Sequence, residues 1–165
     1  MSGISRRLDQ LGRIVLPKEV RKKLKLKEGS LLEIDVVEDE IVLKKSDPVK
    51  DLKDNIEEVC SVVQDCSIVC ISESIIVYAS KAYKNYESKT LRDGMMDSLS
   101  ALSGQNLTNL CLCDDLVINN KIGYFLPLIT YGDLFGYICF FYDEKPKSEQ
   151  EGVMSFIAHY ISSKL

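Results

Sequence analysis

The first 45 residues of the chain have the pattern of short β-strands. Residues 32–36 alternate apolar and charged side chains, which predicts a half-buried strand, and the acidic pair at 39–40 is expected to turn the chain back into the apolar run 41–43. Residues 4–8 form another candidate strand. The run 14–16 is wholly apolar, so we expect it to be buried. These runs predict a small, β-rich N-terminal segment.

A tight turn and a short helix interrupt this strand pattern. The turn is expected at residues 10–13, where Gly12 can adopt a positive φ without steric cost. Pro17 suits the first position of a helix, because its missing N–H would have no helical partner there. The helix is predicted to run to about Leu24, with Val20 and Leu24 one turn apart on its inner side.

Residues 47–66 predict a linker helix. Asp47 can cap its N-terminus, and Pro48 suits its first position. Apolar side chains then recur at alternating spacings of three and four, as in a helical seam, at Val49, Leu52, Ile56, Val59 and Val63. Two heptads are marginal as an isolated helix. The pattern therefore fits a dimerisation helix and an ordinary amphipathic helix lying on its own domain equally well.

Residues 67–165 have the pattern of a second domain that mixes helices and strands. The expected elements are strands at 67–71 and 75–78, a helix over 90–104, three strands at 110–113, 122–129 and 135–142, and a last helix opened by a capping box at 148–151. The sequence thus predicts an α+β protein with domains at 1–46 and 67–165, joined by the helix at 47–66.

Size and charge set the N-terminal segment apart. It is too small to bury an adequate core alone, which predicts an obligate partner chain. The whole chain has a net charge of −4, yet residues 1–27 hold nine basic and two acidic groups, a net charge of +7. The other 138 residues hold 12 basic and 23 acidic groups, a net charge of −11. This separation favours a surface that faces a polyanion, although a solvated basic face would have the same composition.

An ordered motif lies within this basic segment. An arginine pair at 6–7 is followed by Asp9, by Leu-Gly-Arg at 11–13, by an apolar run, and by Pro17 with a short basic helix. The pattern resembles the DNA-binding core of AbrB-like, swapped-hairpin transcription factors. This resemblance implies that hairpins from two chains interleave into one dimeric β-barrel, and that the protein is a DNA-binding regulator.

The resemblance also implies which side chains bind DNA. The family's DNA-contacting positions correspond to Arg6, Arg7, Arg13, Arg21 and Lys22. Arg6 and Arg13 flank the predicted turn, so we expect their guanidinium groups on one side of the sheet. Lys22 stands where an arginine is common, which keeps the charge but loses bidentate hydrogen bonding. Asp9 is expected to cap the turn or position the arginines. The family reads double-stranded DNA by shape, often over A/T-rich sequence.

The remainder of the chain extends this resemblance. A basic head, a helical linker and a C-terminal domain with this order of elements are similar to the SpoVT-like family of sporulation regulators, in which the C-terminal domain is GAF-like. The hairpin expected at 127–138 resembles the family's penultimate hairpin. The resemblance implies control of sporulation or transition-state genes, a homodimer that pairs further into a homotetramer, and a GAF-like domain that serves oligomerisation, small-molecule sensing or both.

Catalytic and cofactor chemistry are not expected. His159, the only histidine, lies on the amphipathic terminal helix. Cys111 and Cys113 share one strand face but lack the two further ligands that a metal site needs. The six cysteines are expected to be reduced core residues. Neither a signal peptide nor an apolar run of about 18 residues is present, which predicts a cytoplasmic, nucleoid-associated protein that does not enter membranes.

Two other functions remain open on the sequence. MazE-like antitoxins share the swapped-hairpin head, but they mask a toxin with a disordered acidic tail, whereas residues 46–165 are rich in apolar runs. The chain could instead be a small-molecule or redox sensor whose head only dimerises. Limited proteolysis of residues 46–165 discriminates the first alternative, and salt-dependent DNA affinity discriminates the second.

Overall fold

The structure is a computed structural model that describes residues 4–26 and 28–165. The chain divides into two compact units, Met1–Ser46 and Asp47–Leu165, which we call the head and the body. Both units contain helix and strand, so the α+β class is confirmed.

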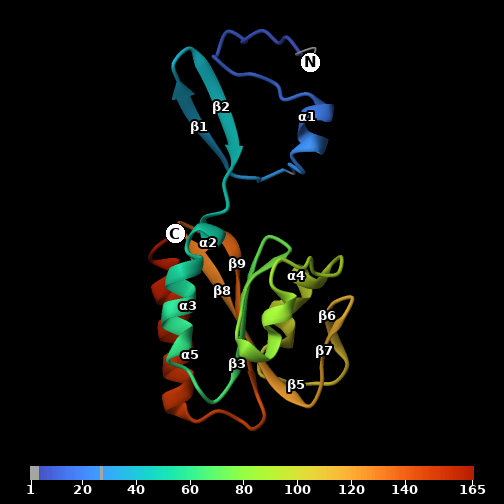
Figure 1. The fold of residues 1–165 in the computed structure, drawn as a ribbon, viewed down its shortest axis with the longest axis vertical. Helices are drawn as coiled ribbons and strands as arrows, with labels where there is room; N and C mark the ends of the chain where they lie inside the picture. The colour runs from blue at the N-terminus through green and yellow to red at the C-terminus, as the bar shows by residue number, and fades with distance from the viewer. Residues whose placement is uncertain (1–3, 27) are drawn as a thin grey trace. The chain divides into compact units, whose positions relative to one another are not determined.

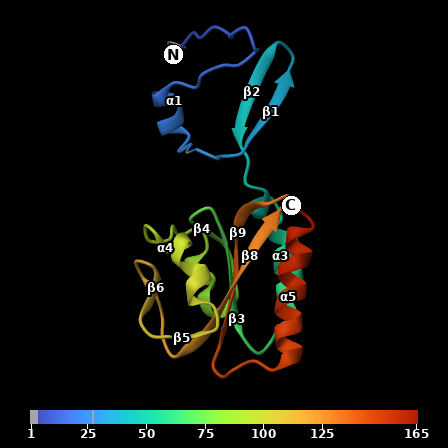
Figure 2. The same cartoon turned by 180° about the vertical axis from the view of Figure 1, so that it is seen from behind.

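The head is built from one helix and one antiparallel hairpin. Its elements are α1 (Lys18–Lys23), β1 (Leu32–Val37) and β2 (Glu40–Lys45). The strand register pairs Ile34 with Leu43 and Val36 with Ile41, so these apolar side chains share one face of the hairpin. Figures 1 and 2 both show α1 on the opposite side of the head from the hairpin. The predicted hairpin is confirmed.

The other apolar runs of the head behave differently in the single chain. Residues 4–8 and 14–16 are not strands, and Val15 is 77% exposed. The prediction that 14–16 is buried is therefore wrong for one chain alone, because an isolated segment lacks the neighbouring strand and the facing apolar surface that it needs. The helix α1 also begins one residue late, since Pro17 is its N-cap rather than its first residue.

The body contains a five-stranded antiparallel sheet. Its strands, in spatial order, are β4 (Ile75–Ala79), β3 (Ser67–Ser72), β9 (Asp133–Tyr142), β8 (Lys121–Thr130) and β5 (Gln105–Leu107). The central strands are apolar on both faces because both faces are covered. Phe140 and Phe141, which are neighbours on β9, belong to the two different cores and are both fully buried. The predicted strands 67–71, 75–78, 122–129 and 135–142 are confirmed.

Two layers cover this sheet. Helices α3 (Lys53–Ser61) and α5 (Ser148–Ser162) lie side by side over one face, as Figure 1 shows. The opposite face carries shorter elements, namely the 3-10 helices η1 (Lys81–Tyr86) and η2 (Leu99–Leu102), the helix α4 (Met95–Ser98) and a separate two-stranded sheet of β6 (Leu110–Cys113) and β7 (Leu116–Ile118). Each layer buries its own apolar core against the sheet.

The linker helix is part of the body. Asp47 caps a short helix, α2 (Pro48–Asp51), by accepting the backbone N–H of Lys50 at 3.1 Å. The chain leaves helical geometry at Leu52, where ψ is 11°, and continues as α3. Val49 and Ile56 from the predicted seam are both fully buried in the core beneath α5. Within the single chain, the apolar seam therefore packs against the body.

Two local predictions in the body are corrected, and two short strands were not predicted. The helix expected over 90–104 is broken, because Gly94 takes a left-handed conformation with φ of 75° and only α4 and η2 follow it. The short strands β5 and β7 had no pattern long enough to predict them. The last helix begins one residue earlier than its predicted capping box implies, since the N-cap is Lys147, whose N–H donates to Oε1 of Gln150 at 2.8 Å.

Candidate DNA-binding site

A tight turn from Asp9 to Arg13 carries one part of the candidate site. Oδ1 of Asp9 accepts the backbone N–H groups of Leu11 at 2.9 Å and Arg13 at 2.7 Å. Oδ2 of Asp9 accepts Nε of Arg13 at 2.9 Å. Gly12 adopts φ of 74°, the left-handed conformation that the turn requires. The expectation that Asp9 caps the turn and positions an arginine is confirmed.

These hydrogen bonds also set the charge state of the turn. The bond from the backbone N–H of Arg13, helped by the Arg13 side chain and the N–H of Leu11, lowers the pKa of Asp9 below its usual value. Asp9 therefore stays ionised and holds one edge of the Arg13 guanidinium. Within the described residues, the two Nη atoms of Arg13 remain available to an external acceptor such as a phosphate.

The structure places the five predicted site residues in two groups. Arg6 and Arg7 precede the turn and Arg13 closes it, and all three are exposed. Arg21 and Lys22 are exposed on α1. The turn and the helix belong to the same basic stretch of the head, but no strand pairing fixes Arg6 and Arg13 on one sheet face in the single chain. The five residues remain predicted DNA contacts.

A further cation, not among the predicted contacts, lies on the same face of α1 as Arg21 and Lys22. Lys18 is exposed at the start of the helix, three and four residues before Arg21 and Lys22. That spacing places all three on one helix face. The signal was present in the sequence, since the same spacing rule applies to any predicted helix.

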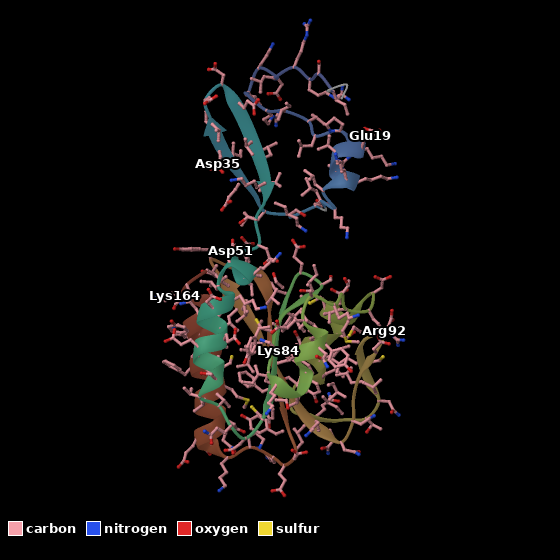
Figure 3. The ribbon with its side chains drawn as sticks, in the orientation of Figure 1. Glu19, Asp35, Asp51, Lys84, Arg92 and Lys164 are labelled. Atoms are coloured by element: carbon pink, nitrogen blue, oxygen red, sulfur yellow. The ribbon has the colours of Figure 1, made fainter. Side chains whose placement is uncertain are left out.

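The hairpin of the head is acidic, in contrast to the basic turn and α1. Its acidic side chains include Asp35, which forms an ion pair with Lys44 at 2.6 Å. The hydrogen bond and charge of Asp35 raise the pKa of Lys44. Three consecutive acids, Glu38, Asp39 and Glu40, form the turn and the first residue of β2. Figure 3 shows Asp35 on the hairpin and Glu19 on α1, on different sides of the head. Phosphates therefore favour the turn and helix over the hairpin.

The head lacks a core of its own. None of the described residues between 4 and 45 is buried. The apolar face of the hairpin is open to solvent, with Ile34 68%, Val36 74% and Ile41 73% exposed. Soluble proteins rarely leave so many neighbouring apolar side chains uncovered unless another surface covers them.

Metal-binding side chains and cysteine thiols are the other groups of the body that could carry chemistry. No cluster of three metal-binding side chains occurs among the residues that the structure describes. Burial raises the pKa of the Cys60 thiol to about 12 and raises the pKa of Cys139 further, so neither is a thiolate at neutral pH. None of the described helices is long and apolar enough to cross a membrane.

Comparison with known proteins connects this geometry to a group of regulators. Residues 6–51 match the family model described as antidote-toxin recognition MazE, bacterial antitoxin. The chain is 29% identical over 158 residues to stage V sporulation protein T of Bacillus subtilis (strain 168), which covers 91% of this chain and 89% of that protein. The chain is therefore SpoVT-like over most of its length.

A second relative is more similar to this chain over a shorter stretch. The chain is 47% identical over 47 residues to the transition state regulatory protein AbrB of the same Bacillus subtilis strain, which covers 28% of this chain and 49% of that protein. The family model covers the segment that carries the Asp9–Arg13 turn and α1. The head is thus AbrB-like, and the similarity to stage V sporulation protein T extends into the body.

Proposed function

We propose that the chain is a DNA-binding transcriptional regulator of the SpoVT and AbrB type, acting on sporulation or transition-state genes. Its head binds double-stranded DNA through Arg6, Arg7, Arg13, Arg21 and Lys22. Such a protein works in the cytoplasm on nucleoid DNA and needs no catalytic group or cofactor. The names of its two relatives, a sporulation protein and a transition state regulatory protein, support this assignment.

The single observation that carries the proposal is the open head. The head has a braced cationic turn and a basic helix, and none of its described residues from 4 to 45 is buried, so it is incomplete as one chain. A second copy that inserts its own hairpin would cover the exposed face of Ile34, Val36 and Ile41. The same exchange would supply the strand neighbours that residues 4–8 and 14–16 lack. We therefore propose an obligate homodimer with a swapped-hairpin barrel.

Dimerisation also accounts for how the head would read DNA. A two-fold axis presents the Asp9–Arg13 turn and α1 twice, at a fixed separation. The site is rich in arginine and lysine and carries no helix shaped for the major groove, so affinity comes mainly from phosphate contacts. Selectivity then comes from DNA shape and deformability, which favours A/T-rich duplexes.

The body is proposed to be a GAF-like domain. The antiparallel sheet, with two long helices on one face and shorter elements on the other, supports this assignment. A cleft of about 480 Å³ is lined by residues that include Arg92, Met95, Asn106, Thr108 and Leu110. Its size suits a small-molecule signal. The body would pair two head dimers into a tetramer and pass that signal to them.

DNA affinity measured over a salt series tests the proposal. Fluorescence anisotropy of an A/T-rich duplex should show affinity that falls by about 0.9 log units per phosphate contact for each log unit of salt. Arg13→Ala and Arg6→Ala should each weaken DNA binding and reduce the slope of log affinity against log salt by the amount expected for one phosphate contact. Sedimentation should show that both variants remain dimers. Weak binding with no salt dependence in all three proteins would contradict a DNA-binding head and favour a sensor whose head only dimerises.

An antitoxin is the second candidate, because the matched family model describes one. Antitoxins of this kind hold a toxin through a disordered tail, whereas Asp47–Leu165 has two cores and a five-stranded sheet. Limited proteolysis separates the two functions. A regulator of the proposed type leaves a stable fragment that begins near Asp47, and an antitoxin tail is degraded.

A further inference from the structure

A buried hydroxyl fastens the first residue of the body to its central sheet. The side chain of Ser72, at the end of β3, is 3% exposed, and its Oγ donates to Oδ1 of Asp47 at 2.5 Å. The same Oδ1 accepts the backbone N–H of Lys50 at 3.1 Å and so caps α2. One carboxylate oxygen therefore joins the start of the helix to a strand 25 residues away in the sequence.

The preceding residue is fastened on the head side. The backbone N–H of Ser46 donates to the carbonyl of Leu31 at 3.1 Å, next to the first residue of β1. The last residue held by the head and the first residue held by the body are thus adjacent in the chain.

We propose that Asp47 and Ser72 are positioning residues that fix the direction in which the chain leaves the body, so that two head dimers of one assembly engage a single duplex together. This inference rests on the proposed DNA-binding function. When two binding units are linked, the second binds at an effective concentration that depends on how well the linkage holds its geometry. Releasing Asp47 from β3 lets the first turn of α2 fray and lowers that effective concentration, while each head dimer keeps its own contacts.

The proposal predicts an effect that depends on the length of the DNA. Ser72→Ala removes the donor, and Asp47→Ala removes the acceptor and the helix cap. Asp47→Asn keeps an Oδ1 acceptor and serves as the conservative variant. Ser155→Ala is the matched control, because its hydroxyl bonds only to the Glu151 carbonyl within α5.

The experiment compares two A/T-rich duplexes, one long enough for a single head dimer and one that carries two such sites. Full-length wild type, Asp47→Asn and Ser155→Ala should bind the two-site duplex much more tightly than the short one. Ser72→Ala and Asp47→Ala should lose about tenfold of that gain, with unchanged affinity for the short duplex. Adding Ser72→Ala to Asp47→Ala should have little further effect, because both remove the same bond.

The outcomes separate this inference from the proposed function. Absence of salt-dependent binding of wild type to either duplex contradicts the DNA-binding function itself. Binding of wild type to both duplexes, with no gain on the longer one or with the full gain kept in Ser72→Ala, overturns the positioning role alone. An equal loss on both duplexes, together with a lower melting temperature, would make the pair merely structural and overturns it as well.

Discussion

Asp9 holds Arg13 at two points, accepting its backbone N–H at 2.7 Å through Oδ1 and its Nε at 2.9 Å through Oδ2. The carboxylate closes the turn and orients the guanidinium at the same time. Asp9→Ala removes both functions, although it also removes a negative charge that would repel phosphate. We expect the loss of geometry to dominate for a shape-selective site, so that preference for A/T-rich over mixed duplexes falls severalfold.

Asp9→Asn is the informative companion to this variant. The amide oxygen can still accept the two backbone N–H groups, but the NH2 group that replaces Oδ2 is a donor, so the charge-assisted bond from Nε of Arg13 is lost. Competition anisotropy with both duplex types should therefore rank discrimination as wild type, then Asp9→Asn, then Asp9→Ala. If Asp9→Ala gained affinity for every duplex without losing discrimination, the acid would act only through its charge and the turn would have no positioning role.

The hairpin of the head provides a test of the proposed dimer. Val36 is 74% exposed on the apolar face shared with Ile34 and Ile41, and its neighbour Val37 points to the opposite face. Val36→Asp would place an unpaired charge in the proposed interface, which costs about 3 kcal/mol and weakens dimerisation roughly 100-fold. Val37→Asp is the matched control. Sedimentation equilibrium should show dissociation of the first variant only, and equal behaviour of the two would contradict a hairpin interface on that face.

Glu87 braces α3 against the opposite layer of the body. Its carboxylate accepts Nζ of Lys53 at 2.7 Å, Nζ of Lys84 at 2.9 Å and the backbone N–H of Ala79 at 3.1 Å. Burial alone would raise its pKa, but these three donors together lower the pKa to about 2 from a usual value of 4.5. Because the folded value is the lower one, the carboxylate stabilises the fold above pH 4.5, and this contribution is lost as the pH falls from about 4.5 to about 2.

Glu87→Gln should therefore reduce the free energy of unfolding by about 2–3 kcal/mol at pH 7. Urea titrations at several pH values should show this difference shrinking below pH 4.5. Glu58→Gln, at an exposed position on α3, is the control and should stay within about 0.5 kcal/mol of wild type. Wild type and Glu87→Gln could instead differ in free energy of unfolding by the same amount at pH 3 and at pH 7. That result would mean that the charge of Glu87 does not stabilise this contact.

The sequence predicted those elements whose pattern is complete within one segment. The strands at 32–36, 122–129 and 135–142 carry alternating or continuous apolar runs, and the cap at Asp47 is a local signal. The prediction of one helix over 90–104 was wrong. Its apolar residues have helical spacing, but Gly94 adopts a left-handed conformation that interrupts the helix. The run at 14–16 failed because its burial depends on a surface that a single chain does not contain.

In the candidate site, too, the sequence predicted the features whose residues are close together along the chain. The Asp9–Arg13 turn was predicted because its residues are consecutive, and Lys18 could have been found from helical spacing alone. The bond between Asp47 and Ser72 could not, because it joins residues that become neighbours only when β3 and α2 are both in place. The cation positions follow from the sequence, whereas the two-fold surface that would unite them depends on a second copy.

Gly136 offers a last test, on the sheet that carries the body. It lies on β9 opposite Ser72, and a Cβ at this position would overlap the carbonyl oxygen of Ile71 on β3. Both strands are central, so the backbone has little room to move, and we expect Gly136→Ala to lower the free energy of unfolding by about 3 kcal/mol or more. Gly152→Ala, on α5 with no atom within 4 Å of its new Cβ, should instead raise it by about 0.5–1 kcal/mol. Chemical denaturation of the two variants beside wild type measures both effects, and a Gly136→Ala protein as stable as wild type would mean that β3 and β9 are not packed this closely.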